Sequence, residues 1–192
     1  MMAEEGESGP LREQILTAAT QLTTSTGWSS VTMSRLADVV GVSRQTVYNE
    51  VGAKPALAEA MILGELARFL DLVTAAFARH PDDLVEAIRD ACAGVLELAQ
   101  DNTLLKAVVS ATHGADTELL PLLTTHAEPL MTAAKTVIAA QLAPYPLRLE
   151  GRQLDATVDM VVRLVLSHVM APSDTPARTA DGIAWIVARV LR

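Results

Sequence analysis

The sequence has almost no cysteine: Cys92 is the single one in 192 residues. One cysteine can form neither an intramolecular disulfide nor a multi-cysteine metal site, which is typical of proteins in a reducing compartment. The ordinary role of a lone cysteine is that of a small buried apolar side chain, and we expect this of Cys92.

Signals for secretion or for insertion into a membrane are missing as well. Glu4, Glu5 and Glu7 occupy the region where a signal peptide would be basic. The uncharged stretch 136–147 is shorter than the roughly 20 residues that a membrane helix needs, and two prolines interrupt it. We therefore expect a cytoplasmic protein that has no membrane partner.

The motifs of the common enzyme classes are also absent. The sequence has no glycine-rich phosphate loop, no nucleophile elbow and no pair of histidines at helical spacing. His113, Asp116 and His126 could contribute to a metal site, but their spacing is not diagnostic of one. We expect a protein that is not an enzyme and that needs no cofactor and no metal.

Positive charge is scarce too, since the formal net charge is −8. A protein that coats nucleic acid by bulk electrostatics needs a cationic surface, so any contact of this chain with DNA must be local. Apolar residues make up 50% of the chain, which excludes a disordered protein and is enough for a sizeable core.

The apolar residues recur at spacings of three and four, whereas the alternation typical of strands is missing. We therefore predict an all-α fold. The expected helices cover about 11–26, 33–40, 44–50, 55–79, 84–100, 129–143, 152–170 and 176–191, with shorter segments between 103 and 125. The first of them should end at Gly27 and bury Ile15, Ala18, Ala19 and Leu22.

Residues 31–54 carry the most informative pattern, two helix starts of the same construction about eleven residues apart. Thr32 and Ser43 are each placed to N-cap a short helix, and Gly41 between them tolerates the positive φ of a tight turn. This spacing predicts a helix-turn-helix. The residues expected to pack it onto the first helix are Leu36, Val39 and Val47.

A helix-turn-helix inserts the first turn of its second helix into the major groove of DNA. That turn carries Arg44, Gln45 and Thr46, which are suited to guanine, adenine and the thymine methyl group. The complete set of predicted DNA contacts is Thr32, Ser34, Arg35, Ser43, Arg44, Gln45, Thr46, Tyr48, Asn49 and Lys54, and Thr32, Ser34, Arg35, Tyr48 and Lys54 among them suit phosphates. Between residues 10 and 55, four basic residues outnumber three acidic ones, so positive charge is concentrated in this segment.

These residues resemble the TetR family of bacterial repressors over about a quarter of the chain. The resemblance rests on 15–27, 31–37, Gly41-Val42-Ser43, Thr46-Val47-Tyr48, Val51 and Lys54. It implies that Tyr48 and Lys54 hold operator phosphates. Glu50 departs from the family pattern, because a carboxylate repels phosphate unless a cation such as Arg35 or Lys54 pairs with it.

The last two helices, about 152–170 and 176–191, are expected to form a homodimer interface. Asp155, Asp159 and Arg163 form one narrow charged stripe on the first of them, and the rest of its circumference is apolar. A helix of this kind must be covered on two sides. The TetR resemblance implies that the two helices pair with their copies in a four-helix interface.

The middle of the chain, 66–142, is apolar and has few charges that could neutralise an ionic ligand. It therefore predicts an apolar or amphipathic effector, such as an acyl chain or a lipophilic drug. The candidate lining residues are Phe69, Phe77, Val95, Leu98, Leu105, Val109, His113, Leu130, Met131, Val162 and Leu166. For each of them an ordinary place in the core is the alternative.

The predicted organisation is a disordered acidic tail over 1–9, a helix-turn-helix DNA-binding domain over 10–55, and an effector-binding and dimerisation domain over 56–192. The predicted function is that of a ligand-responsive transcriptional repressor, which binds a palindromic operator as a dimer and is released by its effector. The alternative is a helical ligand-sensing or protein-interaction bundle that has lost DNA binding, and Glu50 and the acidic net charge favour it.

Overall fold

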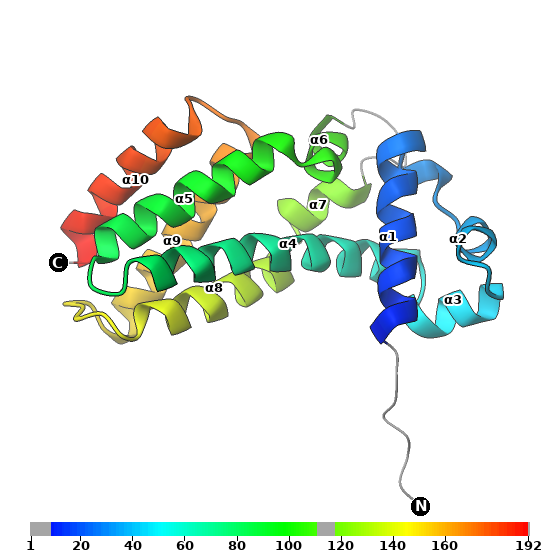
Figure 1. The fold of residues 1–192 in the computed structure, drawn as a ribbon, viewed down its shortest axis with the longest axis horizontal. Helices are drawn as coiled ribbons and strands as arrows, with labels where there is room; N and C mark the ends of the chain where they lie inside the picture. Colours follow the sequence, from blue (N-terminus) through cyan, green and yellow to red (C-terminus); the bar gives the residue numbers. More distant parts are fainter. Residues whose placement is uncertain (1–8, 111–117, 192) are drawn as a thin grey trace, which may run out of the picture. The chain divides into compact units, whose positions relative to one another are not determined.

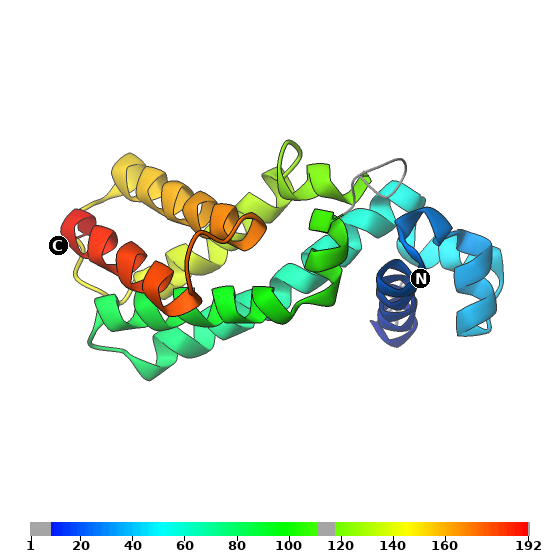
Figure 2. The same cartoon turned by 90° about the horizontal axis from the view of Figure 1, so that it is seen from above.

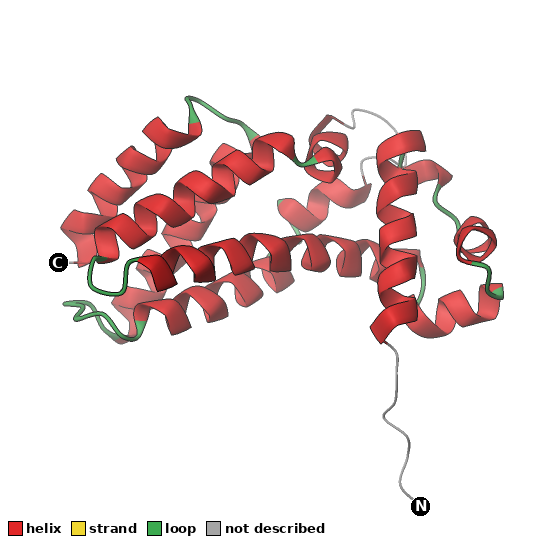
Figure 3. Cartoon of the chain, viewed as in Figure 1, coloured by secondary structure: helices red, strands yellow, loops and turns green. Residues whose placement is uncertain are grey.

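The computed structural model describes residues 9–110 and 118–191, and within these ranges the chain consists of helices and loops without a strand (Figure 3). The helices are α1 (Gly9–Thr26), the 3-10 turn η1 (Trp28–Ser30), α2 (Met33–Val40), α3 (Arg44–Val51), α4 (Lys54–Arg79), α5 (Leu84–Asp101), α6 (Thr103–Ser110), α7 (Leu120–Leu123), α8 (Glu128–Leu142), α9 (Gly151–Met170) and α10 (Pro176–Leu191). The predicted all-α class is confirmed. No helix in the described ranges has the length and apolar character that crossing a membrane requires.

The helix ends lie within about two residues of the predicted ones. The largest difference is at α1, which begins at Gly9 rather than near Leu11 and so takes Pro10 into its first turn. Proline is favoured there because the first N–H groups of a helix have no partner within it. Residues 1–8 of the predicted tail lie outside the described residues, and Gly9, its last residue, is helical.

The chain packs as two compact units. We call the first one the head; it holds the residues up to Gly64 together with Thr103–His126. We call the second one the body; it holds Glu65–Asn102 and the residues from Ala127 onward. Helices α6 and α7 therefore belong to the same unit as α1, α2 and α3, although α5 precedes them in the sequence, and α1 contacts α6 directly.

The head is built on α1, which packs against α2, α3 and α6 (Figure 1). Its fully buried side chains include Ile15, Trp28, Val31, Leu36, Val47 and Leu57. Leu22 of α1 is only partly buried. The expectation that Val39 packs onto α1 is wrong, because Val39 is 56% exposed. Helix α2 buries Met33, Leu36 and Ala37, and a residue two positions after Ala37 lies about 200° away around the helix.

In the body, α10 lies alongside α5, and α9 packs against α8 and α5 (Figures 1 and 2). Gly94 of α5 lets α4 approach closely, because a Cβ atom at this position would lie 2.5 Å from Cδ2 of Leu72. Cys92 is buried among these helices, and burial raises the pKa of its thiol to about 12. Cys92 is thus the inert apolar side chain that was predicted.

Candidate DNA interface

Two capped helix starts build the helix-turn-helix. The Thr32 side chain accepts a hydrogen bond from the Arg35 amide at 3.1 Å, and the Ser43 side chain accepts one from the Thr46 amide at 3.0 Å. Between them Gly41 has φ +80°, and its N–H bonds to the Ala37 carbonyl at 2.9 Å. Both predicted caps and the left-handed turn are confirmed, and together they set where α3 begins.

Helix α3 has one buried and one exposed face. Val47 and Val51 are buried in the interior of the head, whereas Arg44, Gln45, Tyr48 and Asn49 are exposed. Because these four residues fall at positions i, i+1, i+4 and i+5, they share one side of the helix. The exposed side of α3 is therefore polar and able to form hydrogen bonds.

The exposed side chains of α3 pair along the helix. The Arg44 guanidinium donates to the Tyr48 hydroxyl at 3.3 Å and lies 5.4 Å from the centre of its ring. The Gln45 amide donates to the Asn49 side chain at 3.0 Å. Pairs at i and i+4 restrict the rotamers of both partners, so these donors and acceptors are partly oriented before any ligand arrives.

Lys54 starts α4 and is bound to Trp28. Its ammonium donates to the Trp28 carbonyl at 3.0 Å and lies 4.7 Å from the centre of the indole ring. The indole N–H in turn donates to the Glu118 carboxylate at 2.9 Å. Trp28 is buried, and Glu118 lies in the short 3-10 stretch directly before α7. Thus Lys54, Trp28 and Glu118 form one connected set of contacts inside the head.

Glu50 does not pair as the sequence suggested. Among the described residues no cation forms an ion pair with its carboxylate, since Lys54 is bound to Trp28, and Arg35 donates to the Thr26 hydroxyl at 3.5 Å. The Glu50 backbone carbonyl instead accepts a hydrogen bond from the Arg12 guanidinium of α1. Arg12 thereby satisfies a carbonyl at the C-terminal end of α3 and joins that end to α1.

The remaining predicted phosphate contacts lie at the start of α2. Thr32 and Ser34 are exposed, and Arg35 is partly exposed. Thr32 has its side-chain oxygen engaged in the cap, which leaves its hydroxyl hydrogen available as a donor. The start of α2 and the exposed side of α3 both belong to the head, so all the predicted DNA contacts lie in one unit.

The predicted effector-lining residues fall into three groups. Phe69, Phe77, Leu130, Met131 and Val162 are buried in the body, and Val95, Leu98 and Leu166 are partly buried there. Leu105 and Val109 lie on α6 of the head, the first buried and the second exposed. His113 lies outside the described residues, as does Asp116. Within the described ranges no group of three metal-binding side chains is present.

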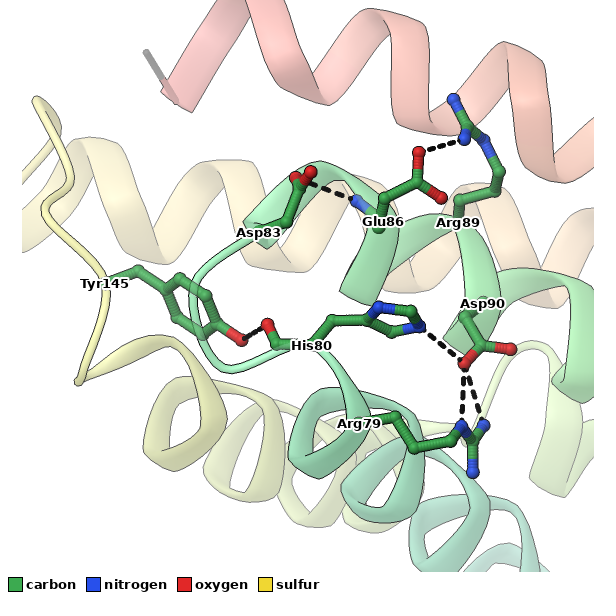
Figure 4. Close-up of polar contacts among 7 residues, drawn as sticks. All are labelled: Arg79, His80, Asp83, Glu86, Arg89, Asp90 and Tyr145. Atoms are coloured by element: carbon green, nitrogen blue, oxygen red, sulfur yellow. Dashed lines mark hydrogen bonds and ion pairs between the residues drawn. The ribbon is translucent and has the colours of Figure 1, made fainter.

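A polar cluster lies at the turn from α4 to α5 (Figure 4). Asp90 accepts hydrogen bonds from Arg79 at 3.0 Å and from the His80 ring at 3.1 Å. The Tyr145 hydroxyl donates to the His80 carbonyl at 2.8 Å, and the Tyr145 ring meets Phe77 edge-on at 6.0 Å. The cluster ties the loop before α9 to this turn, which gives it a structural role.

Two family models match the sequence. Residues 15–61 match the model described as "Bacterial regulatory proteins, tetR family". Residues 83–189, more than half of the chain, match the model described as "Bacterial Tetracyclin repressor, C-terminal domain". The chain belongs to the TetR family. As a TetR-family protein it is a DNA-binding transcriptional regulator and not an enzyme, as the sequence predicted.

Individual relatives of this TetR-family regulator agree with that assignment. The HTH-type transcriptional regulator AlkX of Mycobacterium tuberculosis is 28% identical over 184 residues, which is 95% of this chain and 86% of AlkX. The crystal structure of the TetR family repressor AlkX from Dietzia sp. strain DQ12-45-1b, implicated in biodegradation of n-alkanes, has 30% identity and a TM-score of 0.77, with 96% of each chain covered.

A more distant structure shows the same fold. Thermus thermophilus FadR, a TetR family repressor solved with lauroyl-CoA, has 20% identity and a TM-score of 0.65, and the match covers 94% of this chain and 95% of FadR.

The sequence interpretation missed three residues of the TetR-family head: Arg12, Trp28 and Glu118. Trp28 could have been found from its residue type, because tryptophan is a large side chain that is on average highly buried and the sequence has only two of them. Glu118 carries no such signal, because its partner Trp28 lies 90 residues away in the sequence. Trp28 and Glu118 come together only because the segment Thr103–His126 folds into the same unit as the N-terminal helices.

Proposed function

We propose that this TetR-family regulator is a repressor that binds a palindromic operator as a homodimer and leaves it when an apolar or amphipathic effector binds. The proposal divides the chain as the sequence suggested, with DNA binding in 10–55 and effector binding and dimerisation in 56–192. Within the second segment, α6 and α7 pack with the head, so they are placed to take part in regulation.

The observation that carries the proposal is the polar exposed side of α3, held at its start by the Ser43 cap. A recognition helix reads bases with its first turns, and bidentate contacts discriminate between bases by about 1–3 kcal/mol each. We assign Arg44 and Gln45 to the bases, with Thr46 and Asn49 beside them. We assign Thr32, Ser34, Arg35, Tyr48 and Lys54 to the phosphates, and the Ser43 hydroxyl to the cap and its neighbouring phosphate.

Two exposed apolar surfaces support a homodimer through the last two helices. Helix α10 buries Ala180, Ile183, Ala184, Val187 and Leu191 and exposes Trp185, Ile186 and Val190 on its other side. Helix α9 exposes Met160, at 73% of its surface. Large apolar side chains gathered on one side of a helix are expected to be covered, and a second copy offers an identical complementary surface.

The proposed effector carries a long hydrocarbon chain. The buried side chains of the body are mostly aliphatic, with the aromatic Phe69, Phe77 and Tyr145 among them, and such an interior suits an apolar ligand. The relative AlkX from Dietzia is implicated in biodegradation of n-alkanes, and this points to alkane-derived molecules for the present chain. Because α4 runs without a break from Lys54 to Arg79, it would carry a displacement in the body to the head and change the spacing of the two recognition helices.

Fluorescence anisotropy on the DNA that flanks the gene tests operator binding. Specific binding should weaken steeply as the salt concentration rises, because phosphate contacts release counterions. Arg44→Ala should reduce the preference for the operator over scrambled DNA by about 5- to 150-fold, the equivalent of one lost base contact. Lys54→Ala should weaken binding to both DNAs alike and make the slope of log K against log salt shallower by about 0.9.

Matched controls separate these roles from loss of charge. Arg68→Ala and Lys106→Ala remove exposed basic side chains that are not assigned to DNA, and neither should change the sequence preference. Equal effects of Arg44→Ala and Lys54→Ala on both DNAs would contradict the assignment. Absence of specific binding by the wild type would favour a helical sensing bundle that has lost DNA binding.

Lauric acid, dodecanol and lauroyl-CoA are suitable probes for the effector. At saturation at least one of them should lower operator affinity by about tenfold or more, since a ligand shifts an equilibrium by its differential affinity for the two states. If operator affinity stays unchanged while calorimetry shows that the probe binds, release by the effector is contradicted.

A further inference from the structure

We propose that Glu118, which lies just before α7, is a positioning residue for Lys54 and acts through Trp28 on this phosphate-binding cation of the head. The inference rests on the proposed function, because it concerns how the head holds DNA. The three residues come from η1, from the start of α4 and from the segment before α7, and all of them belong to the head.

Glu118 determines how the Trp28 indole is held. The indole is 2% exposed, and its N–H donates to the Glu118 carboxylate at 2.9 Å. A buried indole N–H needs an acceptor, because leaving it without one costs the desolvation of a polar group. The carboxylate supplies a charge-assisted hydrogen bond, which is stronger than a bond between neutral groups. The indole is thus fixed by packing on its ring and by Glu118 at its edge.

Trp28 in turn holds the Lys54 ammonium at two points, its backbone carbonyl at 3.0 Å and its ring face at 4.7 Å. A carbonyl oxygen accepts one of the three ammonium N–H groups, and the negative face of the indole attracts the charge. At least one N–H therefore remains for a phosphate oxygen. A free lysine side chain loses much rotamer freedom when it binds, and a lysine that is already held loses less.

The position of Lys54 makes this support necessary. Lys54 is the first residue of α4, where the helix dipole is positive and disfavours a cation. The Trp28 carbonyl and ring offset this repulsion and fix the direction of the ammonium. When the Glu118 acceptor is lost, the indole edge is released and the direction of the ammonium is no longer defined. A displacement of Glu118 would have the same consequence.

The test measures operator affinity against salt concentration for the full-length chain. Glu118→Ala should lower affinity several-fold and make the slope of log K against log salt shallower, by up to about 0.9, as expected for Lys54→Ala. Glu118→Gln removes the same negative charge but keeps an oxygen that can accept from the indole, so it should retain the wild-type slope.

The double variant Glu118→Ala with Lys54→Ala should bind no more weakly than Lys54→Ala alone. Glu59→Ala, which removes an exposed carboxylate elsewhere in the head, is the matched control and should leave the slope unchanged.

A purely structural role for Glu118 would lower the melting temperature and leave the salt slope as in the wild type. That result, or additive effects of Glu118→Ala and Lys54→Ala, would overturn the inference while the proposed function stands. A wild-type chain that binds no specific DNA would overturn the proposed function and this role with it. Glu118 is exposed, so its variants are expected to fold, and the two indole N–H signals in an NMR spectrum verify this.

Discussion

Asp90 shows how neighbouring cations outweigh burial at a single carboxyl group. Burial raises the pKa of Asp90. Hydrogen bonds from Arg79 and His80, together with their charges, lower it by more, so the net pKa lies below its usual value of 3.8. The ionised carboxylate is therefore stabilised in the folded state. Because the folded pKa is the lower one, this contribution is present above the unfolded pKa and disappears as the pH falls through the folded pKa.

We expect Asp90→Asn to destabilise the protein by about 0.5–1 kcal/mol at pH 7, a modest value because the pair is partly exposed to solvent. The difference between the variant and the wild type should begin to shrink below about pH 4, near the unfolded pKa, and should vanish as the pH falls through the lower folded pKa. Urea unfolding at pH 7, 5, 4 and 3 measures it. Asp155→Asn, an exposed carboxylate for which no ion pair is described, is the control and should show little difference. If the difference in the free energy of unfolding between Asp90→Asn and the wild type grows as the pH falls, the interpretation is refuted.

The two ends of α3 are held by different kinds of interaction, one local and one from a distant helix. The Ser43 side chain accepts from the Thr46 amide, and the two hydroxyls are 2.8 Å apart. The C-terminal end of α3 is held by Gly52 at φ +72° and by Arg12 on the Glu50 carbonyl. Both ends of α3 are therefore satisfied, the N-terminal end by the Ser43 cap and the C-terminal end by Gly52 and by Arg12 of α1.

Ser43→Ala should cost about 0.5–2 kcal/mol of folding stability, since it removes an N-cap acceptor. Operator affinity should fall as well, because the first turn of α3 holds Arg44 and Gln45. Ser43→Thr keeps the side-chain oxygen and should stay close to the wild type in both respects. Thermal unfolding and anisotropy with operator DNA measure the two effects. Unchanged operator affinity in a destabilised Ser43→Ala protein would mean that the first turn of α3 does not bind the bases.

The assembled protein is expected to bury the apolar side chains that a single copy exposes on α9 and α10. On α10, Trp185 and Ile186 are 58% and 47% exposed, and Arg189 lies 3.8 Å from the Trp185 ring centre. A helix-turn-helix protein reads two half-sites with two copies, so pairing and operator affinity should be linked.

Trp185→Glu should convert a dimer into a monomer at micromolar concentration, because two carboxylates would be buried at an apolar contact. Operator affinity should drop by more than about tenfold, since half of the DNA contacts of the pair are lost. Sedimentation velocity gives the oligomeric state. Ala140→Glu, at an exposed position of α8, is the matched control and should change neither property. A wild-type monomer, or a Trp185→Glu protein that stays dimeric, would exclude this interface.

The pattern of residues along the chain was enough to predict the helices, the two caps and the turn at Gly41, because these depend on side chains within about four positions of one another. The same local pattern placed Arg44 and Gln45 in the exposed first turn of α3, since a cap at Ser43 determines which residues follow it. Contacts between distant segments were not predictable in this way. Val39 faces solvent, α6 and α7 pack with the head, and Trp28 meets Glu118, because many pairings of apolar helix faces are compatible with one sequence pattern and only close packing selects among them.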